Sequence, residues 1–127
     1  MKLVYISLTG NVERFVKHTG LDNISIDDNL PFKEVLEDYV LVIPSYEGEL
    51  INGIADAFIN YKNNKQYLKG IAASGNRNFG DDYCLNGKHL SQKYSRPLIL
   101  MFEFSGTSQD LVRFKKEVEN IEVTRTE

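Results

Sequence analysis

The sequence predicts an α/β protein in which a five-stranded parallel sheet, in the order 2-1-3-4-5, carries helices on both faces. Short apolar runs of strand length alternate with segments whose apolar residues recur at helical spacing. Several of these runs are apolar throughout, which is typical of strands buried on both faces. The chain has 127 residues, so we expect a single domain over residues 1–127.

The first strand is expected at residues 3–6, and a weaker one at 23–26. Between them, an amphipathic helix is predicted by apolar side chains at i, i+3, i+4 and i+7, namely Val12, Phe15, Val16 and Thr19. A short helix with Pro31 in its first turn is then expected, capped by Asp28 or Asn29 and reaching Leu36.

The third strand is the continuous apolar run 39–43, which ends at Pro44. The next helix is predicted by the spacing of Ile51, Ile54, Ala55 and Phe58, with Asn52 as its N-cap. A buried strand at 70–73 follows.

A weaker helix is expected between Asp81 and Tyr94, interrupted by Gly87. The run 97–104 is the strongest strand in the sequence. The last helix carries Leu111, Phe114, Val118 and Ile121 on one face.

Composition argues against several classes of protein. The net charge of −3 and the pI near 5.4 argue against a nucleic-acid binder. No apolar run approaches the ~20 residues of a membrane span, so we expect no membrane partner. The N-terminus is predicted to be a strand and not a signal peptide, and with a single cysteine a cytoplasmic location is expected. His18 and His89 stand alone, so we expect no metal site.

Function is expected in the loops after strands one, three and four, because such sheets bind ligands at the carboxyl ends of their strands. The first loop, SLTGN at 7–11, offers two hydroxyls, a glycine and an asparagine at a helix start. This arrangement suits a phosphate group held by backbone N–H groups and the helix dipole. An ordinary capped turn explains the same residues equally well.

The second loop, PSYEGEL at 44–50, offers the aromatic face of Tyr46 and the conformational freedom of Gly48 between two glutamates. The third loop, SGNRNFG at 74–80, places amide and guanidinium donors beside Phe79. It suits a flat heteroaromatic ring with carbonyls on its edge, and an Asx-rich turn is the alternative. Arg77 either faces the ring or forms a surface ion pair.

Together the three loops favour a mononucleotide site, and a neutral phosphate cradle with aromatic platforms indicates flavin mononucleotide, FMN. The sequence also closely resembles the NrdI family of flavodoxin-like proteins. The residues that carry the resemblance are SLTGNVERFV (7–16), IAASGNRNFGDDYC (71–84) and FEFSGTSQDL (102–111). The likeness covers essentially the whole chain and implies a flavodoxin-like three-layer sandwich.

The resemblance implies a redox activator of class Ib ribonucleotide reductase. In this family, reduced FMN reacts with dioxygen, and the resulting superoxide or peroxide oxidises a dimanganese centre in the small subunit and generates the tyrosyl radical. The partners implied are that radical-bearing small subunit, dioxygen and a flavin-reducing protein. No catalytic residue with a substrate of its own is implied.

By position, residues 7–12 should hold the phosphate, and Tyr46 and Phe79 should flank the ring. The edge of the ring should be lined by Ser74, Gly75, Asn76 and Asn78. The full set of expected cofactor-binding residues is Ser7, Leu8, Thr9, Gly10, Asn11, Val12, Ser45, Tyr46, Glu47, Gly48, Ser74, Gly75, Asn76, Asn78, Phe79, Gly80, Tyr83 and Cys84. One departure from the family is that the loop after strand three has only one glycine, Gly48.

Three interpretations of the function remain open. The protein is either the reductase activator, a general electron-transfer flavodoxin, or a flavin-free binding module that kept the fold.

Cys84 suggests a nucleophile, but a phosphatase would need an arginine where Leu90 stands, so a buried thiol at a helix start is expected.

Overall fold

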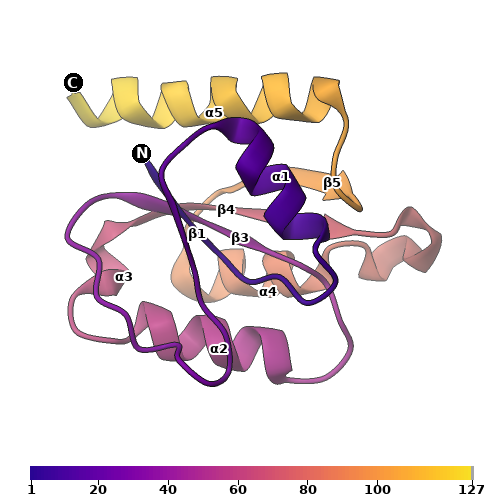
Figure 1. Ribbon diagram of the computed structural model, residues 1–127, viewed down its shortest axis with the longest axis horizontal. Helices are drawn as coiled ribbons and strands as arrows, with labels where there is room; N and C mark the ends of the chain where they lie inside the picture. Colours follow the sequence, from indigo (N-terminus) through magenta and orange to yellow (C-terminus); the bar gives the residue numbers. More distant parts are fainter. Residues whose placement is uncertain (127) are drawn as a thin grey trace.

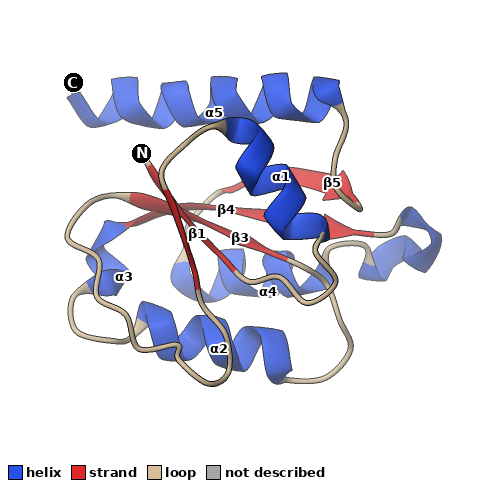
Figure 2. Ribbon diagram, in the orientation of Figure 1, coloured by secondary structure: helices blue, strands red, loops and turns tan. Residues whose placement is uncertain are grey.

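The computed structural model describes residues 1–126 and consists of a sheet between two layers of helices (Figures 1 and 2). The strands are β1 (Lys2–Tyr5), β2 (Asn23–Ser25), β3 (Tyr39–Ile43), β4 (Leu68–Gly75) and β5 (Leu98–Glu103). The helices are α1 (Asn11–Thr19), α2 (Leu50–Ile59), α3 (Asn64–Tyr67), α4 (Leu85–Tyr94) and α5 (Ser108–Thr126), with a 3₁₀ segment η1 (Arg77–Asp82).

The five strands pair in the order β2-β1-β3-β4-β5, and every pairing is parallel. This confirms the predicted order and the predicted class. The order reverses at β1, whose register sets Val4 beside Leu41 of β3. A cleft at the carboxyl ends of β1 and β3 therefore lies at the point where such sheets bind ligands.

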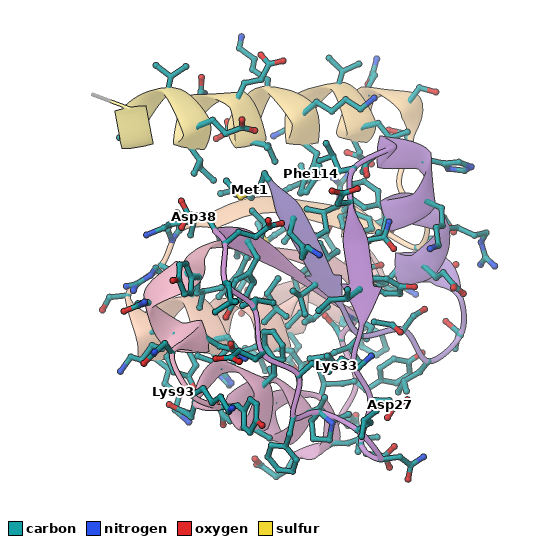
Figure 3. All side chains as sticks on the ribbon, turned by 60° about the vertical axis from the view of Figure 1, so that its left-hand side comes forward. Met1, Asp27, Lys33, Asp38, Lys93 and Phe114 are labelled. Atoms are coloured by element: carbon teal, nitrogen blue, oxygen red, sulfur yellow. The ribbon has the colours of Figure 1, made fainter. Side chains whose placement is uncertain are left out.

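Side chains of the central strands alternate between the two faces of the sheet. Tyr39, Leu41 and Ile43 enter a core shared with α2 and α4, whereas Val40 and Val42 enter a core shared with α1 and α5. On the second face the ring of Phe15 stacks on that of Phe102, with 4.1 Å between the ring centres. It also meets the ring of Phe114 edge-on, with 5.2 Å between the centres. Figure 3 shows Phe114 between α5 and the sheet. Burial on both faces explains why these strands are apolar throughout.

The helix expected between Asp28 and Leu36 does not form, and this prediction was wrong. Asp27 Oδ1 instead accepts the N–H groups of Asn29 and Leu30 in an Asx turn. The N–H of Val35 donates to Asn64 Oδ1 at 2.9 Å, so it is not available for a helical bond. The segment between Asp27 and Asp38 therefore crosses the molecule without regular structure (Figure 3).

Other local expectations, all at helices, also fail. The residue at the N-cap position of α2 is Glu49, and Asn52 lies inside the helix, where its Oδ1 accepts a hydrogen bond from Asn86. Helix α4 begins at Leu85 rather than at Asp81, because Cys84 adopts a left-handed conformation with φ 56° that separates it from η1.

Gly87 does not interrupt α4 but permits its close packing. A Cβ at Gly87 would stand 2.6 Å from Ala73 Cβ on β4. The missing side chain thus lets the helix lie directly on the strand that leads into the third loop, which sets the position of that loop.

Candidate functional site

A cleft of about 150 Å³ opens at the carboxyl edge of the sheet, where the loops after β1, β3 and β4 converge. The end of β5 also contributes, through Phe104. The lining residues are Ser7, Leu8, Thr9, Asn11, Val12, Pro44, Ser45, Tyr46, Ser74, Gly75, Asn76, Phe79, Asp82, Cys84 and Phe104. The three loops singled out in the sequence therefore meet at one place.

The first loop turns sharply into α1 and leaves several donors free. Gly10 precedes the helix with φ 90°, a backbone conformation that residues other than glycine adopt only with strain. The Oγ of Ser7 accepts the N–H of Glu13 at 3.3 Å, so its own hydroxyl proton remains available to a ligand. The N–H groups of the first turn of a helix have no intrahelical partners, and they favour an anion here.

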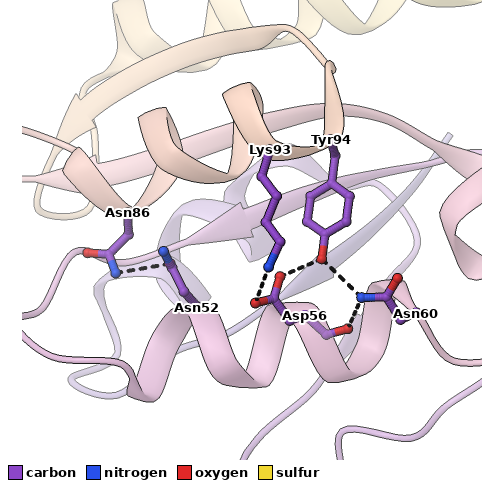
Figure 4. A network of polar contacts seen from close by, with 6 residues as sticks. All are labelled: Asn52, Asp56, Asn60, Asn86, Lys93 and Tyr94. Atoms are coloured by element: carbon purple, nitrogen blue, oxygen red, sulfur yellow. Dashed lines mark hydrogen bonds and ion pairs between the residues drawn. The ribbon is translucent and has the colours of Figure 1, made fainter.

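The second loop is fixed at its base and exposed at its tip. Ser45 Oγ donates to the carbonyl of Ser74 at 2.7 Å, and the N–H of Tyr46 donates to Asn86 Oδ1 at 3.0 Å. Asn86 in turn donates to Asn52 on α2 at 3.1 Å (Figure 4). Tyr46 is 38% exposed, and Gly48 stands in open space with φ 87°.

The third loop is an Asx turn followed by a 3₁₀ segment. Asn76 Oδ1 accepts the N–H of Asn78 at 2.9 Å, so the oxygen of this amide shapes the loop. Asn76 still lines the cleft, whereas Asn78 does not. Phe79 lines it with 64% of its surface exposed.

Arg77 does not line the cleft and forms a surface ion pair. Its Nε lies 3.7 Å from Glu103 Oε1, and its side chain is 70% exposed. The guanidinium carbon lies 5.7 Å from the centre of the Tyr83 ring. The surface interpretation of Arg77 is therefore the correct one.

Cys84 forms part of the floor of the cleft beside Gly75. Its thiol is fully buried and donates to the carbonyl of Ala73 at 3.4 Å. Burial is the main cause that raises the pKa of this thiol above its usual value, so it stays protonated at neutral pH. A Cβ at Gly75 would lie 3.0 Å from the sulfur, and glycine thus keeps the floor open.

Most of the residues expected to hold the cofactor share this cleft, and six do not line it: Gly10, Glu47, Gly48, Asn78, Gly80 and Tyr83. Sequence reasoning missed Pro44, Asp82 and Phe104. Pro44 and Asp82 could have been found, because they lie in segments 44–50 and 71–84, which the sequence analysis had already singled out. Phe104 lay at the end of the strongest predicted strand, which is the fourth strand end at this edge.

The fold and the cleft define a doubly wound mononucleotide-binding protein of the flavodoxin type. A family model described as "NrdI Flavodoxin like" matches residues 3–116, and the chain belongs to this family. FMN is the cofactor of the family.

The donor set of the cleft fits FMN. Hydroxyls of Ser7 and Thr9 and the start of α1 suit a phosphate, and exposed aromatic rings of Tyr46 and Phe79 suit a flat tricyclic ring. The volume of about 150 Å³ is below the ~300–1,000 Å³ of typical small-molecule pockets, so a bound flavin would keep part of its surface outside the protein.

Residues 1–126 contain no group of three or more His, Cys, Asp or Glu side chains that could hold a metal ion. No helix within the same range combines the length and the apolar character needed to cross a bilayer.

Proposed function

We propose that this protein is the FMN-dependent activator of a class Ib ribonucleotide reductase, acting on the small, radical-bearing subunit. When bound and reduced, FMN would pass electrons to dioxygen, and the superoxide or peroxide so formed would oxidise the dimanganese centre that generates the tyrosyl radical. The family assignment and the open cleft at the switch point of the sheet support this proposal.

The observation that carries the proposal is the apolar rim of the cleft. Four large side chains line the cleft and are also exposed, namely Leu8, Tyr46, Phe79 and Phe104. Exposed apolar residues that gather at one place mark contact surfaces for other proteins. A partner docked on this rim would cover the flavin edge and receive the oxidant with little loss to solvent.

Within this function, the residues of the chain bind, orient and shield. Ser7 and Thr9 would donate to the phosphate, and Tyr46 and Phe79 would cover the ring. The thiol of Cys84 stays protonated on the floor of the cleft, so it adds no negative charge beneath the flavin. The rim would exclude water once the partner is bound.

The test begins with the colour of the purified protein. Flavin absorption that is released with the cofactor excludes a flavin-free module. The FMN-loaded protein, reduced and exposed to dioxygen with a manganese-loaded small subunit, should then produce the tyrosyl radical in electron spin resonance. A protein that reduces generic acceptors but leaves that subunit without radical would be a general electron-transfer flavodoxin.

A matched pair of variants tests the rim. Phe104→Ser changes an exposed rim residue that we do not expect to flank the ring, and Leu36→Ser changes an exposed residue just before the amino end of β3. We expect Phe104→Ser to lower the radical yield while FMN binding is retained, and Leu36→Ser to change neither. Equal radical yields in the two variants would contradict docking on the rim.

A further inference from the structure

Arg14 is a charged residue beside the first loop to which sequence patterns assign no role. Its Nη2 donates to Asn11 Oδ1 at 2.6 Å, and its Nε donates to Ser105 Oγ at 3.0 Å. The hydroxyl of Ser105 also donates to Asn11 Oδ1, at 2.9 Å. The three side chains thus form a closed cluster that joins α1 to the loop between β5 and α5.

The cluster fixes the orientation of the Asn11 amide. Its oxygen accepts from both Arg14 and Ser105, so that end of the amide is occupied. An amide carries its acceptor and its donors at opposite ends. Asn11 lines the cleft, and within residues 1–126 its Nδ2 donates to no other residue. The donor end is therefore the one left for an anionic ligand.

The loop that carries Ser105 is itself held against α1. A Cβ at Gly106 would stand 2.8 Å from the ring of Phe15, so this glycine allows the loop to pack directly on the helix. The guanidinium of Arg14 also lies close to the backbone of Gly10, where a Cβ would stand 2.9 Å from Nη1. A positive charge is thereby held beside an otherwise neutral phosphate cradle.

We propose that Arg14 is the positioning residue that makes the site selective for FMN over riboflavin. This inference rests on the proposed flavin function. Arg14 acts through Asn11, because it turns the amide so that its N–H₂ group donates to the phosphate. Riboflavin lacks the phosphate, so the cluster contributes nothing to riboflavin affinity.

The experiment measures the dissociation constants of FMN and of riboflavin by quenching of flavin fluorescence, for the native chain and five variants. Arg14→Ala and Asn11→Ala should each weaken FMN binding about tenfold, as expected for one charge-assisted hydrogen bond. The double variant should be weakened little beyond either single variant, because the two residues act as one unit. Riboflavin affinity should stay within about twofold throughout.

Lys17→Ala is the matched control, since it removes the same charge from the exposed side of the same helix. It should leave the ratio of FMN to riboflavin affinity unchanged. Arg14→Lys keeps the charge but cannot bridge Asn11 and Ser105, so it should recover only part of the loss. If Arg14→Ala does not fold, Arg14→Lys and Ser105→Ala replace it, and the ratio of FMN to riboflavin affinity should fall in both.

Three results would overturn the inference: equal losses for FMN and riboflavin, additive effects of Arg14→Ala and Asn11→Ala, or full recovery by Arg14→Lys. These affinities are measured without any partner protein. Failure of the native FMN-loaded chain to activate the reductase subunit would therefore contradict the proposed function. It would not affect the measured ratio of FMN to riboflavin affinity, which tests the role of Arg14 separately.

Discussion

The two ends of the cleft are built differently. At the phosphate end, residues 7–12 are held by side-chain hydrogen bonds from α1 and from the loop after β5, through Arg14 and Ser105. At the ring end, residues 45–50 and 76–83 are bonded at their bases, but their tips lie in solvent. Under the proposed function, a rigid anchor for the phosphate would face open platforms for the ring, and the flavin edge would stay accessible to dioxygen and to a partner.

The largest effect that tests this comparison is expected at the base of the ring end. Gly87→Ala would place a Cβ 2.6 Å from Ala73 Cβ and 3.2 Å from Leu98 Cδ1, so α4 must move off the sheet. We expect the free energy of unfolding, measured with urea, to fall by about 3 kcal/mol. In the control Gly53→Ala on α2 the new Cβ meets nothing within 4 Å, and a gain of about 0.5 kcal/mol is expected. An unchanged stability for Gly87→Ala would mean that α4 adjusts freely and that the base is not rigid.

The next effect concerns the hydrogen bond that holds the second loop. Asn86→Ala removes the acceptor of the Tyr46 N–H and the donor to Asn52, in a side chain that is 7% exposed. We expect a loss of about 2 kcal/mol in unfolding free energy, because a partly buried N–H is left without a partner. The visible spectrum of bound FMN should also change, since Tyr46 is released.

Asn60→Ala provides the control for Asn86→Ala, because it changes an exposed asparagine on the same α2–α4 interface (Figure 4). The side-chain amide of Asn60 donates to the hydroxyl of Tyr94 at 3.1 Å and to the carbonyl of Asp56 at 2.9 Å, and neither partner belongs to the second loop. The loss should stay below about 1 kcal/mol, with an unaltered flavin spectrum. Equal spectral changes in the two variants would show that Asn86 acts only through general stability.

Much of this architecture could be predicted because it depends on local pattern. The run 39–43 is apolar at every position and became β3 with the same bounds, and the stripe on α1 gave its buried face. The failures depend on contacts distant in sequence. The expected helix around Pro31 does not form, and the N–H of Val35 donates to Asn64 instead. Local sequence pattern cannot predict a hydrogen bond between residues so far apart.

The same distinction applies to the site. The three loops could be found because parallel strands bring their carboxyl ends to one edge. Arg14 could not, because its partner Ser105 lies 91 residues away and the spacing between them carries no signal. Asn76 lines the cleft as expected, and its oxygen also forms the Asx turn that the residue types had left as an alternative.

A smaller effect is expected at the tip of the ring end. Gly48 has φ 87° and open space around it, so Gly48→Ala should cost only the strain of a left-handed alanine, about 1 kcal/mol. Gly20→Ala at the end of α1 is matched, with φ 72° and equally open surroundings. Both variants should lose similar stability in urea, but only Gly48→Ala should weaken FMN binding. Equal FMN affinities would show that the tip of this loop takes no part in holding the ring.

The smallest effect is chemical and tests whether the floor of the cleft opens in solution. Cys84 is fully buried, and burial raises the pKa of its thiol, so its reaction with Ellman's reagent should be at least about tenfold slower than in the unfolded chain. The rate should still be rising with pH above ~8.5, where a free thiol levels off.

The sign of the stability effect at Cys84 follows from the raised pKa. The unfolded chain loses the thiol proton first, so the free energy of unfolding should decrease as the pH rises through the unfolded value near ~8.5. Cys84→Ala should remove this part of the decrease, and native and variant curves should run parallel below that pH. Rapid labelling at neutral pH would mean that the floor opens as readily as the tips, and the contrast between a fixed base and open platforms would then be wrong.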